Sequence, residues 1–326
     1  MKSDVPIIDL HCDLLGCIAY NQGKYHFESP EINCSVPQLM QGNVKLQVLA
    51  IAAITQENSS QIGREQLKLY QELLVSHASK VASFKEFSLQ SPKIHFLFAI
   101  ENASALLDEG EPLDLFFERF ENCQALNEIL YMSFTWNHEN RFGGGNATQI
   151  GLKSDGESVL KYLDGKKVAI DLSHTSDRLA WDILDYVEKK SLDIPVTASH
   201  SNFRSVQDVK RNLPDELAQE VIRRKGLIGL NFVQRFVGSS PEHFLDHIDH
   251  ALNLGGEDTI CLGADFYGAL DIPAALCPGK MDSPFFDAFS NSSCYPKWTQ
   301  LLQERFSREL IQKICHRNVE RFCVCK

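Results

Sequence analysis

Six side chains that commonly bind metal ions stand within a few residues of the ends of short apolar segments of this sequence. They are His11, Asp13, Glu101, His174, His200 and Asp265. His11 and Asp13 follow the apolar segment 5–10, and alternate residues of an extended chain point to the same side, so the pair could hold one ion together. Imidazole nitrogen and carboxylate oxygen suit zinc or a similar divalent ion. The pattern therefore predicts a metal site built from strand ends.

Each of these residues alone has a structural explanation. A histidine after a strand is often a hydrogen-bonded loop residue, and Asp265 could cap a helix or bind backbone amides. Their recurrence at six such positions is much harder to explain by structure alone. With one shared carboxylate, the set is sufficient for two metal ions. Two ions roughly 3.5 Å apart can hold a bridging hydroxide and polarise a carbonyl group, which is a chemistry suited to hydrolysis.

Eight short apolar segments can position these side chains. In chain order they are residues 5–10, 44–54, 94–100, 129–134, 168–172, 195–198, 227–231 and 259–263. Most intervals between them have a helical pattern, for example residues 61–84 and 113–126. This alternation predicts an α/β fold, a (β/α)8 TIM barrel, in which catalytic residues lie at the carboxyl ends of the strands.

The remaining segments complete one predicted domain over residues 1–326. Helical patterns at 296–306 and 308–323 predict C-terminal helices that pack against the barrel. Residues 21–41 are polar and irregular, and we expect a long loop over the strand ends there. The loop at 137–149 would help to select the substrate.

Composition and charge exclude some classes of function. The formal net charge is −11, whereas binding to nucleic acid or an anionic membrane requires clustered Lys and Arg. No apolar run approaches the roughly 18 residues of a membrane span. The first residues lack the pattern of an export signal, and the ten cysteines are scattered. We therefore expect a cytoplasmic protein with reduced thiols and no nucleic-acid or membrane partner.

Several phrases of the sequence occur in an order that resembles a known family. They are Ile-Asp-Leu-His-Cys-Asp, Ile-Glu-Asn-Ala, Asp-Leu-Ser-His-Thr-Ser, Ser-His-Ser-Asn-Phe-Arg, Gly-Leu-Asn-Phe and Leu-Gly-Ala-Asp-Phe-Tyr-Gly. Each phrase is a weak signal, but the ordered set is specific. It resembles the membrane (renal) dipeptidase family, the M19 metallopeptidases, over roughly residues 5–325, and the resemblance implies that family's (β/α)8 fold.

The resemblance also implies roles for individual residues. His11 and Asp13 would bind one zinc ion, His174 and His200 would bind the other, and Glu101 would bridge them. Asp265 would shuttle a proton between the bridging water and the leaving amine. Arg211 would grip the terminal carboxylate of the substrate, since a planar guanidinium suits that group, and Arg204 is a competing candidate.

One position departs from the mammalian members of the family. They carry Thr-His after the fourth strand, where the histidine helps to bind the scissile carbonyl oxygen. This chain has Thr135-Trp136-Asn137-His138, so that Trp136 stands in the place of the histidine. Asn137 or His138 could supply the hydrogen-bond donor, or the metal alone could hold the oxyanion.

These observations predict a metallodipeptidase that uses two Zn²⁺ ions, or other divalent metals, and a bridging hydroxide to hydrolyse dipeptides. A homodimer is possible. One alternative is another amide or lactone hydrolase on the same barrel, because barrels keep a metal site and change their loops. A second is a metal-binding receptor without turnover, and only the Trp136 departure supports it.

Overall fold

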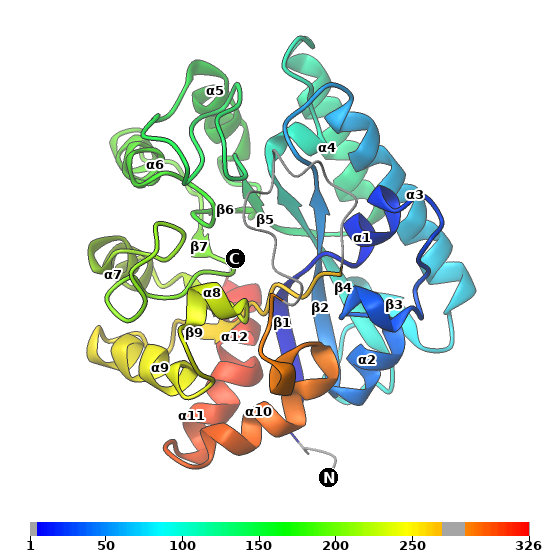
Figure 1. The fold of residues 1–326 in the computed structure, drawn as a ribbon. Coiled ribbons are helices and arrows are strands. Elements are labelled where there is room, and N and C mark those ends of the chain that lie inside the picture. The colour runs from blue at the N-terminus through cyan, green and yellow to red at the C-terminus, as the bar shows by residue number, and fades with distance from the viewer. Residues whose placement is uncertain (1–4, 269–283, 326) are drawn as a thin grey trace.

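The computed structural model describes residues 5–268 and 284–325, and within them eight parallel strands close into a barrel surrounded by helices (Figure 1). The barrel strands are β1 (Ile7–Cys12), β2 (Val44–Ala52), β4 (Ile94–Glu101), β5 (Ile129–Ser133), β6 (Ala169–Asp171), β7 (Val196–Ala198), β8 (Leu227–Leu230) and β9 (Ile260–Leu262). The predicted (β/α)8 fold is therefore confirmed. Of the domain predicted over 1–326, residues 1–4, 269–283 and 326 lie outside the described part.

The strength of strand pairing varies around the barrel. The β2–β4 ladder is continuous from Leu46 opposite His95 to Ala52 opposite Glu101. By contrast, β1 and β9 meet through a single ladder pair, Asp9 opposite Leu262. This junction between the first and the last strand, which we call the seam, depends on additional contacts beside the ladder.

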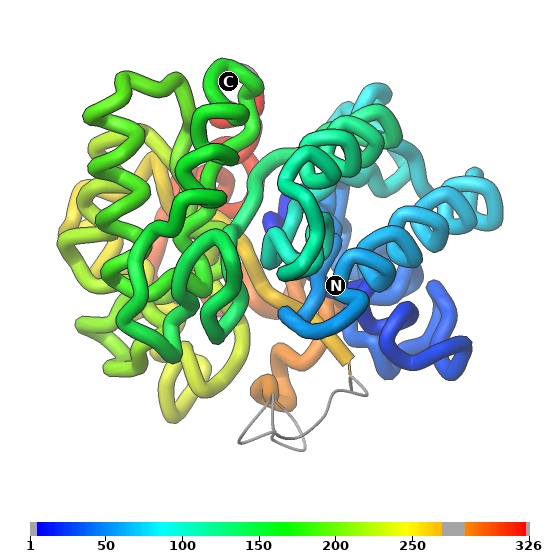
Figure 2. Tube along the Cα trace, turned by 90° about the horizontal axis from the view of Figure 1, so that it is seen from above, coloured from blue at the N-terminus to red at the C-terminus, as the bar shows by residue number. Residues whose placement is uncertain are grey.

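Helices alternate with the strands, and most of them cover the outside of the barrel. They are α1 (Leu14–Tyr20), α2 (Val36–Gln41), α3 (Ser59–Ser76), α4 (Asp114–Leu126), α5 (Ser154–Leu163), α6 (Asp177–Lys189), α7 (Asp215–Arg223), α8 (Gln234–Val237), α9 (His243–Asn253), α10 (Tyr295–Leu302), α11 (Arg308–Gln312) and α12 (Asn318–Cys325). Figure 2 shows the helices up to α4, coloured blue to teal, on one side and the green helices α5 and α6 on the other. None of the helices in these ranges is both long and apolar enough to cross a bilayer.

Two apolar clusters hold the barrel together. The larger one packs the strands against the outer helices. The smaller one fills the interior and includes Leu10, Val48 and Leu97 of the strands. Val319 and Phe322 of α12 belong to this inner cluster, so the C-terminal helix plugs the barrel. The burial of these large side chains stabilises the scaffold by roughly 1.5–3 kcal/mol each.

Two local predictions are wrong. The helix predicted over 61–84 ends at Ser76, and residues Val81–Ser83 form a ninth strand, β3, beside the start of β4. Val81 pairs opposite Ile94, so the backbone after Ser76 joins the sheet instead of continuing the helix. The loop predicted over 21–41 contains α2, whose N-terminus carries a capping box from Ser35 and Gln38.

Candidate metal centre

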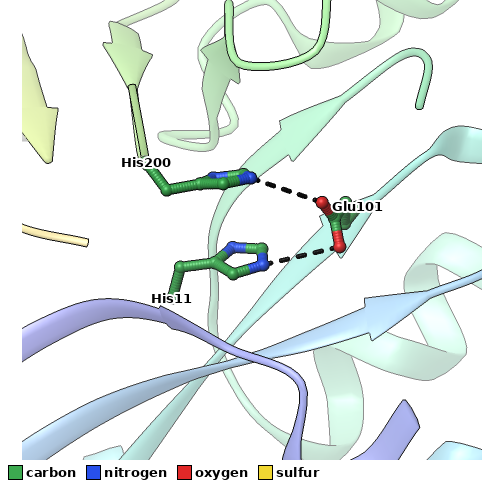
Figure 3. Close-up of side chains that lie close together, drawn as sticks. All are labelled: His11, Glu101 and His200. Atoms are coloured by element: carbon green, nitrogen blue, oxygen red, sulfur yellow. Dashed lines mark ion pairs between the residues drawn. The ribbon is translucent and has the colours of Figure 1, made fainter. Parts of the chain in front are cut away.

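The barrel brings the six predicted metal-site residues together at the carboxyl ends of its strands. They are His11 on β1, Asp13 before α1, Glu101 at the end of β4, His174 after β6, His200 after β7 and Asp265 after β9. None of the six is more than 9% exposed. In Figure 3, Glu101 faces both His11 and His200, which approach it from different strands.

The two carboxylate oxygens of Glu101 face different groups of histidines. Its Oε2 lies 3.4 Å from Nε2 of His11. Its Oε1 lies 2.9 Å from Nε2 of His174 and 3.3 Å from Nε2 of His200. A carboxylate with one oxygen toward each group has the arrangement required to bridge two ions.

Two further carboxylates surround His11. Its Nε2 lies 4.0 Å from Oδ1 of Asp13 and 3.8 Å from Oδ1 of Asp265. The other oxygen of Asp265, Oδ2, accepts a hydrogen bond of 2.8 Å from the side chain of Asn231. The two oxygens of Asp265 are thus distinct, because one faces the candidate site and the other is anchored to the end of β8.

An irregularity in β1 directs His11 into the site. From Asp9 to Cys12, β1 advances by three residues, whereas the paired part of β2, from Gln47 to Leu49, advances by only two. A bulge of this kind re-aims a side chain. His11 and Asp13 lie close together, but not because alternate residues of a regular strand point to the same side. β1 is irregular at His11 and ends at Cys12, before Asp13.

Two of the candidate ligands have a left-handed backbone. The φ angle is 67° at His174 and 61° at Asp265. Such conformations cost a residue other than glycine on the order of 1–3 kcal/mol, and they cluster at functional sites. The backbone of Asp265 forms a hydrogen bond across the seam, because its N–H donates to the carbonyl of His11 at 3.1 Å.

The back nitrogen, Nδ1, of each histidine contacts a hydrogen-bond acceptor. Nδ1 of His11 contacts the hydroxyl of Tyr131 at 2.6 Å, and this hydroxyl donates to the carbonyl of Leu10. Nδ1 of His174 lies 3.0 Å from Oδ1 of Asn137. Nδ1 of His200 lies 2.7 Å from the hydroxyl of Ser199. A proton on each Nδ1 leaves the Nε2 lone pairs free for metal ions, as in established metal sites.

The ionisable groups of the cluster shift one another's pKa values. Burial lowers the pKa of His11, but the carboxylates of Glu101, Asp13 and Asp265 together outweigh this effect and raise the pKa to about 10. Although burial raises the pKa of Glu101, the contacts with His11, His174 and His200 hold it well below its usual range. Burial, together with Glu101, raises the pKa of Asp265 to about 6 against the opposite effects of His11 and Arg211.

The residues present fit a divalent metal ion. Nε2 of His11 is buried and has no hydrogen-bond partner among the described residues, although carboxylate oxygens surround it. Within 4.8 Å, ligand atoms group as His11, Glu101 and His200, and also as His11, Asp13 and Asp265. These mixed nitrogen and oxygen donors suit zinc and similar metals.

Two glycines allow the backbone before His200 to reach its position. A Cβ atom added to Gly229 of β8 or to Gly263 after β9 would lie 1.9 Å from the carbonyl oxygen of Ser199. The clash would be with backbone and not with the end of a flexible side chain. Both positions therefore require glycine for the end of β7 to pack against its neighbours.

The two arginines proposed for carboxylate binding have different surroundings. Arg204 donates from both terminal nitrogens to Asp177, at 2.7 and 2.9 Å, and from Nε to the carbonyl of Asn212. Arg211 is 6% exposed and donates from Nη1 to Ser201 at 2.8 Å. Its Nε and Nη2 are buried without a partner in the described chain. Only Arg211 therefore retains unused donors.

The residues after β5 do not form one substrate-binding group. The Trp136 ring lies 6.0 Å from that of His174, and Asn137 contacts Nδ1 of His174. His138 is exposed, and its backbone carbonyl accepts a hydrogen bond from Gly145. Trp136 and Asn137 thus lie at the site, while His138 lies on the surface.

Several polar residues behind the ligands were missed by the sequence interpretation. They are Asp9, Tyr131, Asp171, Ser199 and Asn231. Asp9 accepts from the backbone N–H groups of His11 and Ala264 and from the hydroxyl of Tyr295. For Asp9 and Asp171 a signal was available in the sequence, since each is a polar residue inside an apolar strand and a buried polar group requires a partner.

Solved structures with the same fold include known metallopeptidases. Dipeptidase AC, a metallopeptidase of family M19, has a TM-score of 0.77 and 20% identity, and the likeness covers 98% of each chain. A metallopeptidase from Rhodobacter sphaeroides, solved with a phosphinate mimic of the dipeptide L-Ala-D-Ala, has the same TM-score and identity and covers 98% of this chain and 99% of that one. At these identities the likeness establishes a shared fold.

Sequence comparisons extend the relationship. An uncharacterized protein in the PQQ-III 3' region of Acinetobacter calcoaceticus is 28% identical over 220 residues, covering 61% of this chain and 65% of that protein. One in the pqqA 5' region of Klebsiella pneumoniae is 29% identical over 185 residues, covering 52% and 64%. The chain thus matches just under two thirds of each relative. The family model described as membrane dipeptidase (peptidase family M19) matches residues 1–324. This chain therefore belongs to the membrane dipeptidase family, peptidase family M19.

Proposed function

We propose that this protein is a two-metal dipeptidase that hydrolyses the peptide bond of dipeptides. The observation that carries the proposal is Glu101, whose two oxygens face His11 on one side and His174 with His200 on the other. His11, Asp13 and Glu101 would hold one Zn²⁺ ion, and Glu101, His174 and His200 would hold the second. When bound, such ions supply an activated water nucleophile and polarise the scissile carbonyl.

Asp265 is the candidate catalytic acid and base. Its Oδ1 faces the cluster, while Asn231 fixes Oδ2. A carboxyl group can exchange protons efficiently when its pKa is close to the working pH, and burial raises the pKa of Asp265 toward that range. Asp265 would take the proton of the attacking water and deliver it to the leaving amine.

Arg211 is the candidate group for binding the free carboxylate of a dipeptide. Its buried, unpartnered Nε and Nη2 can donate to one carboxylate, and Ser201 holds Nη1. Ser201 also contacts Ser173, whose hydroxyl accepts from the backbone N–H of His200. These contacts link Arg211, which would bind the substrate carboxylate, to His200 at the second proposed metal position. A carboxylate site connected in this way to the metal position suits a short substrate.

We expect Arg211→Ala to weaken binding of dipeptides with a free C-terminal carboxylate. Loss of a buried charge contact costs about 2 kcal/mol or more, which corresponds to roughly 30-fold in kcat/KM, mainly through KM. Kinetics on a dipeptide and on its C-terminal amide would measure the effect. Arg204→Ala is the matched control, because Arg204 is already paired with Asp177. If Arg204→Ala abolishes the carboxylate preference and Arg211→Ala does not, the two roles are reversed.

A combined metal and activity assay tests the proposed function. The purified protein would be offered L,L and L,D dipeptides and N-acyl amino acids, with metal content measured in the same sample before and after chelation. We expect about two ions per chain and dipeptide cleavage that stops on chelation and returns with metal. Cleavage of N-acyl amino acids alone would favour the alternative hydrolase. Binding of two ions without turnover of any substrate would favour the other alternative, a metal-binding receptor that is not an enzyme.

A further inference from the structure

Asp171 is a buried carboxylate that the proposed reaction does not use. It is the last residue of β6 and is completely inaccessible to solvent. Its Oδ2 accepts from the hydroxyls of Ser133 and Ser199 at 2.7 and 2.8 Å. Its Oδ1 accepts from the backbone N–H of Ser199 at 2.6 Å and from the hydroxyl of Thr197 at 3.2 Å. Burial raises the pKa of Asp171, whereas the hydrogen bonds that both oxygens accept act in the opposite direction and favour the ionised carboxylate.

Ser199 connects this carboxylate to His200. The hydroxyl of Ser199 has a single proton, which it donates to Asp171, so its oxygen must accept the proton on Nδ1 of His200. Nε2 of His200 is then free of a proton and lies 3.3 Å from Glu101. The orientation of one hydroxyl group therefore determines which nitrogen of His200 can bind a metal ion.

This contact differs from those behind the other two histidines. Nδ1 of His11 contacts Tyr131, which donates onward to a backbone carbonyl, and Nδ1 of His174 contacts a neutral amide. Behind His200 the hydrogen bonds continue to an acidic side chain, Asp171. Burial, together with Asp171, also raises the pKa of Tyr131. A negative group behind a metal-binding imidazole raises its basicity and fixes its tautomer.

We propose that Asp171, acting through Ser199, is a positioning residue for the metal ion that His174 and His200 would hold. It orients the Ser199 hydroxyl, keeps the proton of His200 on Nδ1 and strengthens Nε2 as a ligand. This inference rests on the proposed two-metal site and is independent of the substrate.

Asp171→Asn should reverse the direction of this chain of hydrogen bonds. The side-chain oxygen of Asn must stay at the Oδ1 position, because the backbone N–H of Ser199 can only donate. The amide nitrogen then occupies the Oδ2 position and donates to the Ser199 hydroxyl. Ser199 in turn donates to Nδ1 of His200, which leaves the imidazole proton on Nε2, where it blocks metal binding.

Metal titration of the metal-free protein tests the proposal. Wild type, Ser199→Ala, Asp171→Asn and Ser133→Ala would be titrated with Zn²⁺ against a competing chelator and with Co²⁺ monitored by visible absorption. We expect one of the two ions to bind about 10–100-fold more weakly in Ser199→Ala and Asp171→Asn. The cobalt absorption of that site should change, while the other ion binds as in wild type. Ser133→Ala is the matched control, because Ser133 donates to the same oxygen of Asp171.

Distinct outcomes separate this inference from the proposed function. A wild-type protein that fails to bind two ions contradicts the proposed metal site itself. Wild-type affinity for both ions in Ser199→Ala and Asp171→Asn overturns only the role of Asp171. Equal loss of both ions in all three variants, with lower thermal stability of the metal-free proteins, would show a general packing role and also overturn it. If Asp171→Asn does not fold, Ser199→Ala still decides the question.

Discussion

Glu101→Gln should remove most of the bound metal and the activity together. A glutamine side chain has one oxygen and one NH₂ group, so it can face only one of the two histidine groups as a ligand. It also removes the negative charge nearest to Nε2 of His11 and His174. We expect a loss in kcat/KM of at least about 100-fold, corresponding to about 2.7 kcal/mol, and metal occupancy well below that of wild type.

Metal analysis and kinetics on the same Glu101→Gln sample would measure both effects. Glu118→Gln is a suitable control, since Glu118 is an exposed residue of α4 and undergoes the same chemical change. High concentrations of added metal should restore part of the activity if weak binding is the cause. A fully loaded and fully active Glu101→Gln variant would show that this carboxylate does not bridge metal ions.

Asp265→Asn should separate turnover from metal binding. Asparagine cannot exchange a proton, but it has almost the same shape and can still accept from Asn231 through its side-chain oxygen. Removal of a general acid and base typically costs 10²–10⁴-fold in rate, so we expect kcat to fall by roughly that factor. The variant should retain most of its metal and still bind a non-hydrolysable dipeptide mimic.

Binding and turnover would be measured separately for Asp265→Asn, by titration with a phosphinate dipeptide mimic and by steady-state kinetics. Asp249→Asn on the outer helix α9 provides a control for the same substitution away from the barrel end. Wild-type kcat in Asp265→Asn would assign proton transfer to another group. Loss of both metal ions would assign Asp265 a role as a ligand.

The barrel and the six clustered residues could be predicted from the sequence for a physical reason. Parallel strands joined by helices place all their carboxyl ends at one end of the barrel, so residues far apart in sequence, such as His11 and Asp265, converge there. The residue types then limit the chemistry. The family prediction is confirmed by the match over residues 1–324, and the fold prediction by the closed sheet.

The supporting residues could not be predicted in the same way. The role of Ser199 depends on Asp171, which lies on a different strand, and that of Tyr131 depends on the bulge that turns His11 inward. Such contacts are set by strand register and side-chain direction, which local patterns do not determine. The end of α3 at Ser76 was predicted wrongly for a local reason. The helical spacing of apolar residues continues to Val81, although the backbone there has already left the helix.

The seam has a consequence for biosynthesis. Its contacts are hydrogen bonds from Asp265 N–H to the carbonyl of His11 and from Asp13 N–H to the carbonyl of Phe266, and His11 and Asp13 are synthesised well before the other two residues. The sheet therefore stays open beside His11 and Asp13 until β9 has been synthesised. The last helix, α12, can fill the interior only after that. Under the proposed ligand assignment, His174, His200 and Glu101 are all available earlier. Cotranslational folding would thus present the second metal position before the first, and barrel closure would complete the pair.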